Sequence, residues 1–171
     1  MAIKRQIFYS FHYDNDVFRV QQIRNIGALE DNEPVSANNW EEVKKGKDPA
    51  IEKWINENMK NRTCVVVLIG EGTAQRPWVR YEIKKAWKDG KGILGIHIHN
   101  LKCAKTIKAN PNSTGKCSKG SNPFDSFTIN GKDMSSIVHC YNPDSINPYK
   151  DIKENLEKWV EAAIEIRNNH K

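Results

Sequence analysis

The chain has no apolar run near the ~20 residues that a membrane-spanning helix requires. Its opening, MAIKRQIFYSFHYDND, turns polar and acidic where a signal peptide would stay apolar. Its four cysteines are irregularly spaced and form no C-x-x-C pair, which indicates neither a zinc site nor a disulfide framework. With 171 residues, 38% of them hydrophobic and 28% charged, the chain is expected to be one cytoplasmic domain over residues 1–171.

The common nucleotide-binding and hydrolytic motifs are missing as well. There is no G-x-G-x-x-G, and Gly115-Lys116 lacks both the upstream Gly and the following Ser or Thr of a P-loop. A phospho-receiver domain needs an Asp at the end of its central strand, and the run at 63–70 ends without one. No Ser or Cys stands beside a His in a way that suggests a catalytic triad.

Acidic residues are absent from residues 91–120, which hold six lysines and alone account for the net charge of +6. A nucleic-acid-binding surface more typically spreads Lys and Arg over a helix or sheet face with stacking aromatics between them. Here the basic residues are all Lys, in a stretch rich in Ser, Asn and Gly, so nucleic acid is disfavoured as a partner. We expect a solvated loop, or a mobile loop that attracts a small anionic ligand.

Metal-ligand spacing is also lacking. His97 and His99 stand two residues apart on an expected strand, where they share a face and could in principle bind a metal. No third ligand follows at a recognisable spacing, so no metal site is predicted.

Strand and helix patterns alternate along the chain. This alternation predicts an α/β fold of flavodoxin-like, doubly wound type, with a mostly parallel sheet of four or five strands and helices on both faces. The expected strands are 3–10, a short one at 34–35, 63–70, 92–99 and 135–141. The expected helices run from a cap at Asp14 or Asn15 to about 26, from about 50 to 59, 77–88 and 149–168, and a long loop insertion occupies about 100–127.

Ligands of such sheets bind at the carboxyl ends of the strands. The loop at 10–16, the loop at 70–77 and the start of the helix at Trp78 all meet that edge. The lysine-rich insertion leaves from the same edge.

The helix RPWVRYEIKKAW carries one carboxylate where an apolar side chain is expected. On a helical wheel Glu82 falls inside an apolar arc, whereas its basic residues and Tyr81 lie on the other side. The arc consists of Trp78, Val79, Ile83, Ala86 and Trp87. Glu82 could reach the rim of the interface and pair with Arg80, Lys85 or a loop amide. Alternatively, it could line a cleft, where burial penalises its charge.

Two stretches resemble the Toll/interleukin-1 receptor (TIR) domain family. IFYSFHYDND resembles the family's F-I-S-Y-x-x-x-D opening, and RPWVRYEIKKAW resembles its third helix, in which W-x-x-x-E places a glutamate. The resemblance is closest to the TIR-like proteins of the bacterial Thoeris anti-phage system and extends from Ile7 to the strand at 92–99. The segment between the first two helices and the insertion at 100–127 depart from the family pattern.

The resemblance implies an NAD-consuming enzyme in which Glu82 is catalytic. Such an enzyme breaks the nicotinamide–ribose bond of NAD⁺ and makes a cyclic ADP-ribose-type signal that activates a separate effector protein. NAD⁺ is the substrate, and no other cofactor is implied. Ser10, His12 and Asp14 are expected to hydrogen-bond the nicotinamide riboside end, and Phe11 and Tyr13 to stack on it. Trp78 is a further candidate for substrate binding, although one turn before Glu82 its expected role is to anchor the helix.

The resemblance also allows a homo-oligomer and a phage-derived trigger, and it implies no membrane partner. Many TIR domains only assemble with other proteins, so a non-catalytic interaction module is the alternative. The two hypotheses differ at Glu82, because an assembly module would tolerate Glu82→Gln whereas an enzyme would lose NAD turnover.

Overall fold

A four-stranded parallel sheet forms the centre of the computed structural model, which describes residues 5–24, 26 and 48–171, with the backbone alone at 13–15. Its strand order is β1-β2-β3-β6. The strands are β1 (Ile7–Phe11), β2 (Cys64–Ile69), β3 (Gly92–His97) and β6 (Cys140–Tyr141). Every residue of β2 is buried, as its β-branched run predicts for a central strand covered on both faces. The predicted α/β class is confirmed.

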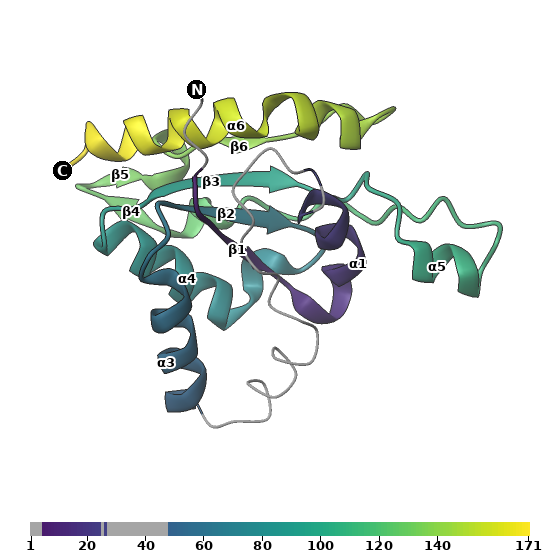
Figure 1. The fold of residues 1–171 in the computed structure, drawn as a ribbon, viewed down its shortest axis with the longest axis horizontal. Coiled ribbons are helices and arrows are strands. Elements are labelled where there is room, and N and C mark those ends of the chain that lie inside the picture. The colour runs from purple at the N-terminus through teal and green to yellow at the C-terminus, as the bar shows by residue number, and fades with distance from the viewer. Residues whose placement is uncertain (1–4, 25, 27–47) are drawn as a thin grey trace.

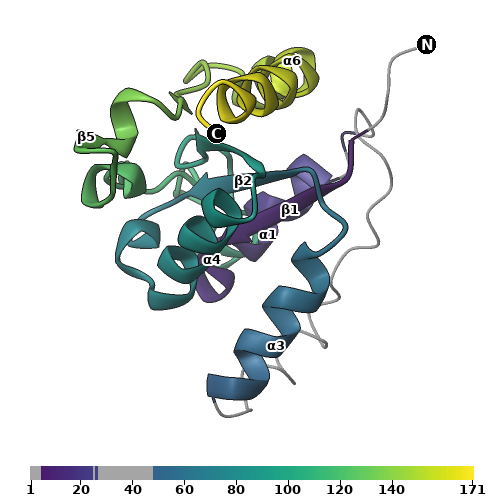
Figure 2. The same cartoon turned by 90° about the vertical axis from the view of Figure 1, so that its left-hand side faces the viewer.

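Helices cover both faces of this sheet (Figures 1 and 2). On one face, α3 (Asp48–Met59) and α4 (Pro77–Lys88) share an apolar cluster with alternate residues of the strands. On the other face, α1 (Tyr13–Arg24) and α6 (Pro148–Asn168) share a second cluster. Successive strand residues point to opposite faces, so Ile7 belongs to the α1/α6 cluster and Phe8 to the α3/α4 cluster.

Several predicted element bounds need correction or fall outside the described residues. The strand expected at 3–10 begins at Ile7 and ends at Phe11, and the strand expected at 92–99 ends at His97. The first helix begins at Tyr13, before the predicted caps Asp14 and Asn15. The strand expected at 135–141 is reduced to β6, because Ile137 and Val138 donate their N–H groups to the carbonyl of Met134 in a helical turn and cannot extend the ladder. The short strand expected at 34–35 lies outside the described residues.

A short antiparallel hairpin, β4 (Thr128–Ile129) and β5 (Lys132–Asp133), was not predicted. Its turn is Asn130-Gly131, with φ of 51° and 80°. This Asn-Gly pair is typical of a two-residue hairpin turn, but the flanking strands are too short to give a pattern of alternation.

The lysine-rich insertion at 100–127 is more ordered than a solvated loop. It contains α5 (Ala104–Ala109), which has no buried residue, and the 3₁₀ turn η2 (Pro123–Ser126), in which Phe124 is completely buried. A second 3₁₀ turn, η1 (Thr73–Gln75), lies between β2 and α4, and a third, η3 (Met134–Ser136), lies between β5 and β6. Among the described residues no helix has the length and apolar character to cross a bilayer.

Candidate functional site

Glu82 lies in the second turn of α4 and faces the sheet. Its side chain is 5% exposed, and it accepts a hydrogen bond from the hydroxyl of Ser10 on β1. Ser10 is itself 1% exposed. The contact is built by two periodicities: alternation along β1 turns Ser10 toward α4, and the helical period of α4 places Glu82 between buried Val79 and Ala86.

This environment favours the neutral form of the Glu82 carboxyl. Burial raises its pKa to about 8, although the hydrogen bond from Ser10 acts in the opposite direction. A carboxyl group with such a pKa is charged only when something offsets the loss of water. An arriving cation or hydrogen-bond donor would do so, which is typical of a binding or catalytic position.

Arg80 and Lys85, the two basic residues offered as partners of Glu82, are engaged elsewhere. Arg80 donates to the hydroxyl of Ser126 at 2.7 Å, and Lys85 pairs with Asp89 at 2.7 Å. Glu82 is therefore buried against the sheet, and it does not form the exposed ion pair that the sequence left open.

The other predicted site residues surround the end of β1 at different orientations. Phe11 is partly buried against the α1/α6 cluster, on the face opposite to Glu82, because it follows Ser10 in the strand. His12 is half-buried, and its carbonyl accepts the N–H of Asp16 at 3.0 Å. The side chains of Tyr13 and Asp14 lie outside the described part of the structure. Trp78 packs against the α3/α4 cluster, with its ring edge-on to Tyr81 at 5.6 Å between centroids.

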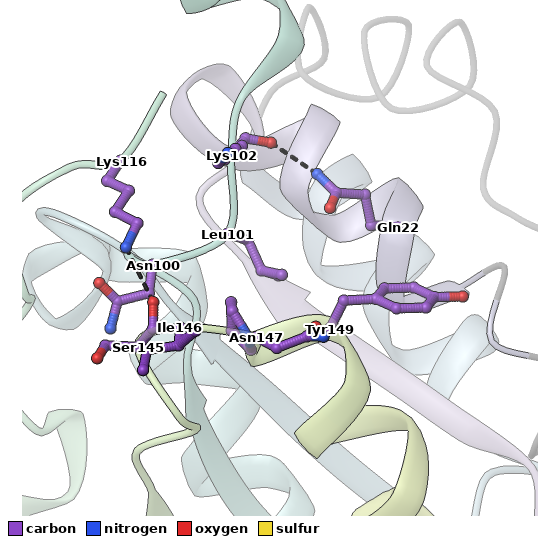
Figure 3. Close-up of a pocket in the computed structure, with 10 residues that line it drawn as sticks. Gln22, Asn100, Leu101, Lys102, Lys116, Ser145, Ile146, Asn147 and Tyr149 are labelled. Atoms are coloured by element: carbon purple, nitrogen blue, oxygen red, sulfur yellow. Dashed lines mark hydrogen bonds between the residues drawn. The ribbon is translucent and has the colours of Figure 1, made fainter. Parts of the chain in front are cut away.

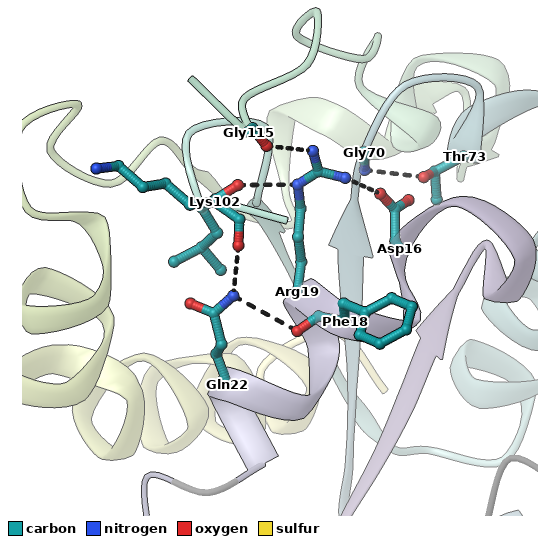
Figure 4. Close-up of polar contacts among 9 residues, drawn as sticks. Asp16, Phe18, Arg19, Gln22, Gly70, Thr73, Lys102 and Gly115 are labelled. Atoms are coloured by element: carbon teal, nitrogen blue, oxygen red, sulfur yellow. Dashed lines mark hydrogen bonds and ion pairs between the residues drawn. The ribbon is translucent and has the colours of Figure 1, made fainter. Parts of the chain in front are cut away.

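Sequence reasoning missed a buried ion pair at the same edge of the sheet (Figure 4). Arg19 Nη1 lies 3.2 Å from Asp16 Oδ1, with side chains 6% and 1% exposed. Burial raises the pKa of Asp16 to about 6, against the attraction of Arg19. The signal was present: positions 16, 19, 20 and 23 form one helical face, so two charged residues share the stripe of Val20 and Ile23.

Gly70 is the point at which the surrounding loops meet. A Cβ on Gly70 would overlap the Asp16 carboxylate, and a Cβ on Gly120 would overlap the Gly70 carbonyl oxygen. The N–H of Gly70 donates to the hydroxyl of Thr73 at 2.9 Å, as Figure 4 shows. The loops after β1 and β2 and the insertion therefore pack together at the carboxyl edge, as the α/β topology predicts.

His97 and His99 lie at the carboxyl end of β3 and beyond it. Their rings are 5.9 Å apart, and His97 Nε2 lies 3.4 Å from Cys140 Sγ. Burial, with Lys119 and His99 nearby, lowers the pKa of His97 to about 4. Among residues 5–24, 26 and 48–171, no three His, Cys, Asp or Glu side chains gather as a metal site would need.

Two cavities adjoin the insertion. One, of about 450 Å³, lies beside the start of α4 and is lined by Gln75, Arg80 and Ser121 among others. The other, of about 620 Å³, is bounded by Gln22 of α1, by Lys102 and Lys116 of the insertion, and by the start of α6 at Tyr149 (Figure 3). None of the predicted site residues lines the larger cavity.

Comparisons with known proteins agree with this arrangement. The family model of the Thoeris protein ThsB, TIR-like domain, matches residues 8–103. A curated protein of Bacillus cereus (strain MSX-D12), named as a proposed cyclic ADP-D-ribose synthase, ThsB1, is 36% identical over 143 residues. The alignment covers 80% of this chain and 70% of that relative.

The range matched by the family model contains β1 except for Ile7, together with α1, α4 and β3, and with them Ser10, Glu82 and the Asp16–Arg19 pair. It stops near the start of the insertion. The family model matches more than half of the chain, and the relative is 36% identical over most of it. Both findings support the same family. The chain belongs to the Thoeris ThsB family of TIR-like domains.

Proposed function

We propose that this protein is an NAD-consuming enzyme of bacterial anti-phage defence that cleaves the nicotinamide–ribose bond and makes a cyclic ADP-ribose-type signal. The observation that carries the proposal is the buried carboxyl of Glu82, held by Ser10 at the carboxyl edge of the sheet. The name of the Bacillus cereus relative, a cyclic ADP-D-ribose synthase, supports the same reaction. NAD⁺ is the substrate, and the proposed reaction calls for no other cofactor.

The bond to be broken joins C1′ of the ribose to N1 of the nicotinamide ring. The bonding electron pair leaves with nicotinamide, which becomes a neutral molecule, so no general acid has to protonate it. Positive charge then develops on the ribose, as in glycoside cleavage. A fixed carboxylate beside the ribose stabilises that charge in the transition state, and Glu82 is proposed to supply it.

The pKa of Glu82 fits this role once substrate is considered. In the free protein the carboxyl is largely protonated near neutral pH, because its pKa is raised to about 8. The nicotinamide ring of NAD⁺ is a cation, and an opposite charge within a few ångströms lowers the pKa of a carboxyl. Substrate binding would therefore itself generate the carboxylate that the reaction uses.

The product depends on what captures the ribosyl group. Attack of water on C1′ gives ADP-ribose and releases a proton, whereas attack of a hydroxyl of the same molecule on C1′ closes a ring and likewise releases the hydroxyl proton. Cyclisation requires that water be excluded while the two ends of the molecule meet. In this proposal the lysine-rich insertion helps to close the site and to attract the pyrophosphate, and the cyclic product activates a separate effector in the cytoplasm. A homo-oligomer and a phage-derived trigger remain part of the proposal.

The test is release of nicotinamide from NAD⁺ by purified protein, with mass analysis of the second product. Wild type, Glu82→Gln and the exposed control Glu154→Gln are compared, each with and without lysate from infected cells. We expect Glu82→Gln to lose on the order of 100-fold or more of the turnover while keeping the wild-type circular dichroism spectrum. Glu154→Gln should retain full activity. Equal turnover by Glu82→Gln and wild type, or no turnover under any condition, would reject the proposal.

A further inference from the structure

Arg19 fastens the insertion to α1 through two nitrogens of its guanidinium group, and the third pairs with Asp16 of the same helix. Nε donates to the carbonyl of Leu101 at 2.9 Å, and Nη2 donates to the carbonyl of Gly115 at 2.8 Å. Nη1 lies 3.2 Å from Asp16 Oδ1. The group is buried, and each of its three nitrogens has one such contact (Figure 4). One side chain of α1 thus holds both the segment that leaves β3 and a point 14 residues further along the insertion, as the positions 101 and 115 give.

Beyond Gly115 the chain continues across the carboxyl edge. The N–H of Cys117 donates to the carbonyl of His99 at 3.0 Å. Gly120 lies so close to the carbonyl of Gly70 that no side chain fits between them, and Ser121 accepts a hydrogen bond from Gln75 at 3.3 Å. We call residues 115–121 the strap. The strap contacts the loop after β2, which runs directly into α4 and Glu82.

Asp16 connects Arg19, which holds the insertion, to Gly70 in the loop after β2. Its carboxylate is paired with Arg19 and packs against Gly70, whose carbonyl oxygen lies against Gly120 of the strap. The ion pair therefore fixes α1, the loop after β2 and the strap relative to one another. A buried pair of this kind is an unreliable source of net stability, but it can specify one arrangement of the segments that it joins.

We propose that Arg19 is a positioning residue: with Asp16 it latches the strap across the carboxyl edge, against the loop that leads into α4 and Glu82, so that the strap forms one wall of the substrate site. This inference rests on the proposed function, because it takes NAD⁺ as the substrate bound at this edge. The latch acts on where the substrate is held and not on the bond that breaks. Its loss therefore raises the KM for NAD⁺ and leaves kcat much less affected.

Two variants are designed to loosen the latch, which is the attachment of the strap by Asp16 and Arg19. One acts at the ion pair and the other at Gly120 in the strap. The pair Asp16→Asn with Arg19→Met removes both charges together, so that no uncompensated charge is left buried. Gly120→Ala leaves the ion pair intact and pushes the strap away from Gly70. Arg5→Met is the matched control, because it removes an arginine that pairs with Glu161, outside the strap. Circular dichroism of each variant verifies folding.

The first readout is limited trypsin digestion, which does not depend on activity. The strap contains Lys116 and Lys119 as cleavage sites. We expect both latch variants to be cut there at least 10-fold faster than wild type and Arg5→Met. Cleavage of the folded latch variants at the wild-type rate would overturn the latch.

The second readout is protection of the strap by NAD⁺ in a Glu82→Gln background, where binding is measured without turnover. NAD⁺ should slow cleavage at Lys116 and Lys119 in the Glu82→Gln protein. This protection should be lost when Glu82→Gln is combined in the same chain with either set of latch substitutions. If NAD⁺ protects but wild type shows no turnover, the latch stands and the proposed chemistry fails. If NAD⁺ gives no protection, or if KM for NAD⁺ is unchanged in active latch variants, the strap is not a substrate wall and the inference is wrong.

Discussion

A carboxyl group that is removed from water keeps its proton unless a nearby cation or hydrogen-bond donor stabilises the charged form. Among the described residues, no cation lies close enough to Glu82 to lower its raised pKa. In the described part of the chain, its hydrogen-bond partner is the hydroxyl of Ser10, which donates to the carboxyl. That hydrogen bond favours the charged form and lowers the pKa that burial has raised. Ser10 therefore controls the pH at which free enzyme offers a carboxylate.

This relation predicts a pH profile. If ionised Glu82 is required, kcat/KM for NAD⁺ is low at acidic pH and rises as the carboxyl ionises around pH 8, because kcat/KM reports the free enzyme. Ser10→Ala removes the hydrogen bond to the charged form, so the inflection moves upward by about one pH unit. The measurement is kcat/KM from pH 6 to 10, with exposed Ser136→Ala as the control. A profile that Ser10→Ala shifts downward would contradict this role.

The same kind of sequence signal had two different outcomes. Glu82 could be found because a single charge interrupted an apolar arc of α4, and burial confirms its position. Asp16 and Arg19 interrupt the stripe of α1 in the same way, yet the carbonyl groups of Leu101 and Gly115 that Arg19 binds are more than 80 residues away in sequence. A helical wheel shows that a charge is misplaced, but only the tertiary fold shows what it binds.

At the scale of elements, the strands and helices that sequence patterns identified are those with long apolar repeats. The bounds of β2 and α4 agree closely with the predicted ones, because a β-branched run defines β2 and a proline at the first helical turn defines the start of α4. β6 was overestimated because the apolar residues before it, including buried Val138, serve the α3/α4 cluster from a turn and not from a strand. Burial and strand pairing are separate constraints, and apolar content indicates only the first.

The insertion illustrates the same distinction. Its composition is that of a loop, but Phe124 at its end is completely buried in the α3/α4 cluster, beside Val67 and Ile69 of the sheet. One aromatic residue in a polar segment gives no periodicity, so the anchor could not be inferred from pattern. It fixes the far end of the insertion, whereas Arg19 fixes the near end.

Phe124→Ala should therefore be strongly destabilising. Loss of a fully buried ring is expected to lower the free energy of unfolding by about 3–5 kcal/mol, because the cavity cannot close completely. Ile146→Ala is the control: its side chain is 91% exposed, so its effect should stay within about 0.5 kcal/mol. Denaturant unfolding followed by circular dichroism measures both. A Phe124→Ala variant as stable as Ile146→Ala would show that the insertion is not anchored there.

For the whole molecule, the reaction outcome depends on how tightly separate segments close around one edge of the sheet. The loops after β1 and β2 and the strap come from residues 10–16, 70–77 and 115–121, and they meet only because parallel strands end at a common edge. Water reaching a ribosyl intermediate through an open edge would compete with cyclisation.

Product composition measures this closure. Gly120→Ala, which displaces the strap from Gly70, should increase the fraction of linear ADP-ribose relative to cyclic product by several-fold, even where total nicotinamide release is similar. Mass spectrometry separates the two products because hydrolysis adds one water. Arg5→Met should keep the wild-type ratio. An unchanged ratio in an active Gly120→Ala variant would mean that water is excluded by another part of the molecule.

Arg19 holds the insertion by the backbone carbonyl oxygens of Leu101 and Gly115, and these two hydrogen bonds use no side chain of the insertion, although the φ of 74° at Gly115 favours glycine there. These hydrogen bonds therefore do not depend on most side chains of the segment between Leu101 and Gly115. Residues of that segment, including the exposed lysines of α5, can be exchanged without loosening the attachment. This arrangement separates a buried backbone attachment from an exposed surface, so the side chains of that surface can be changed to alter what it binds while the attachment stays in place.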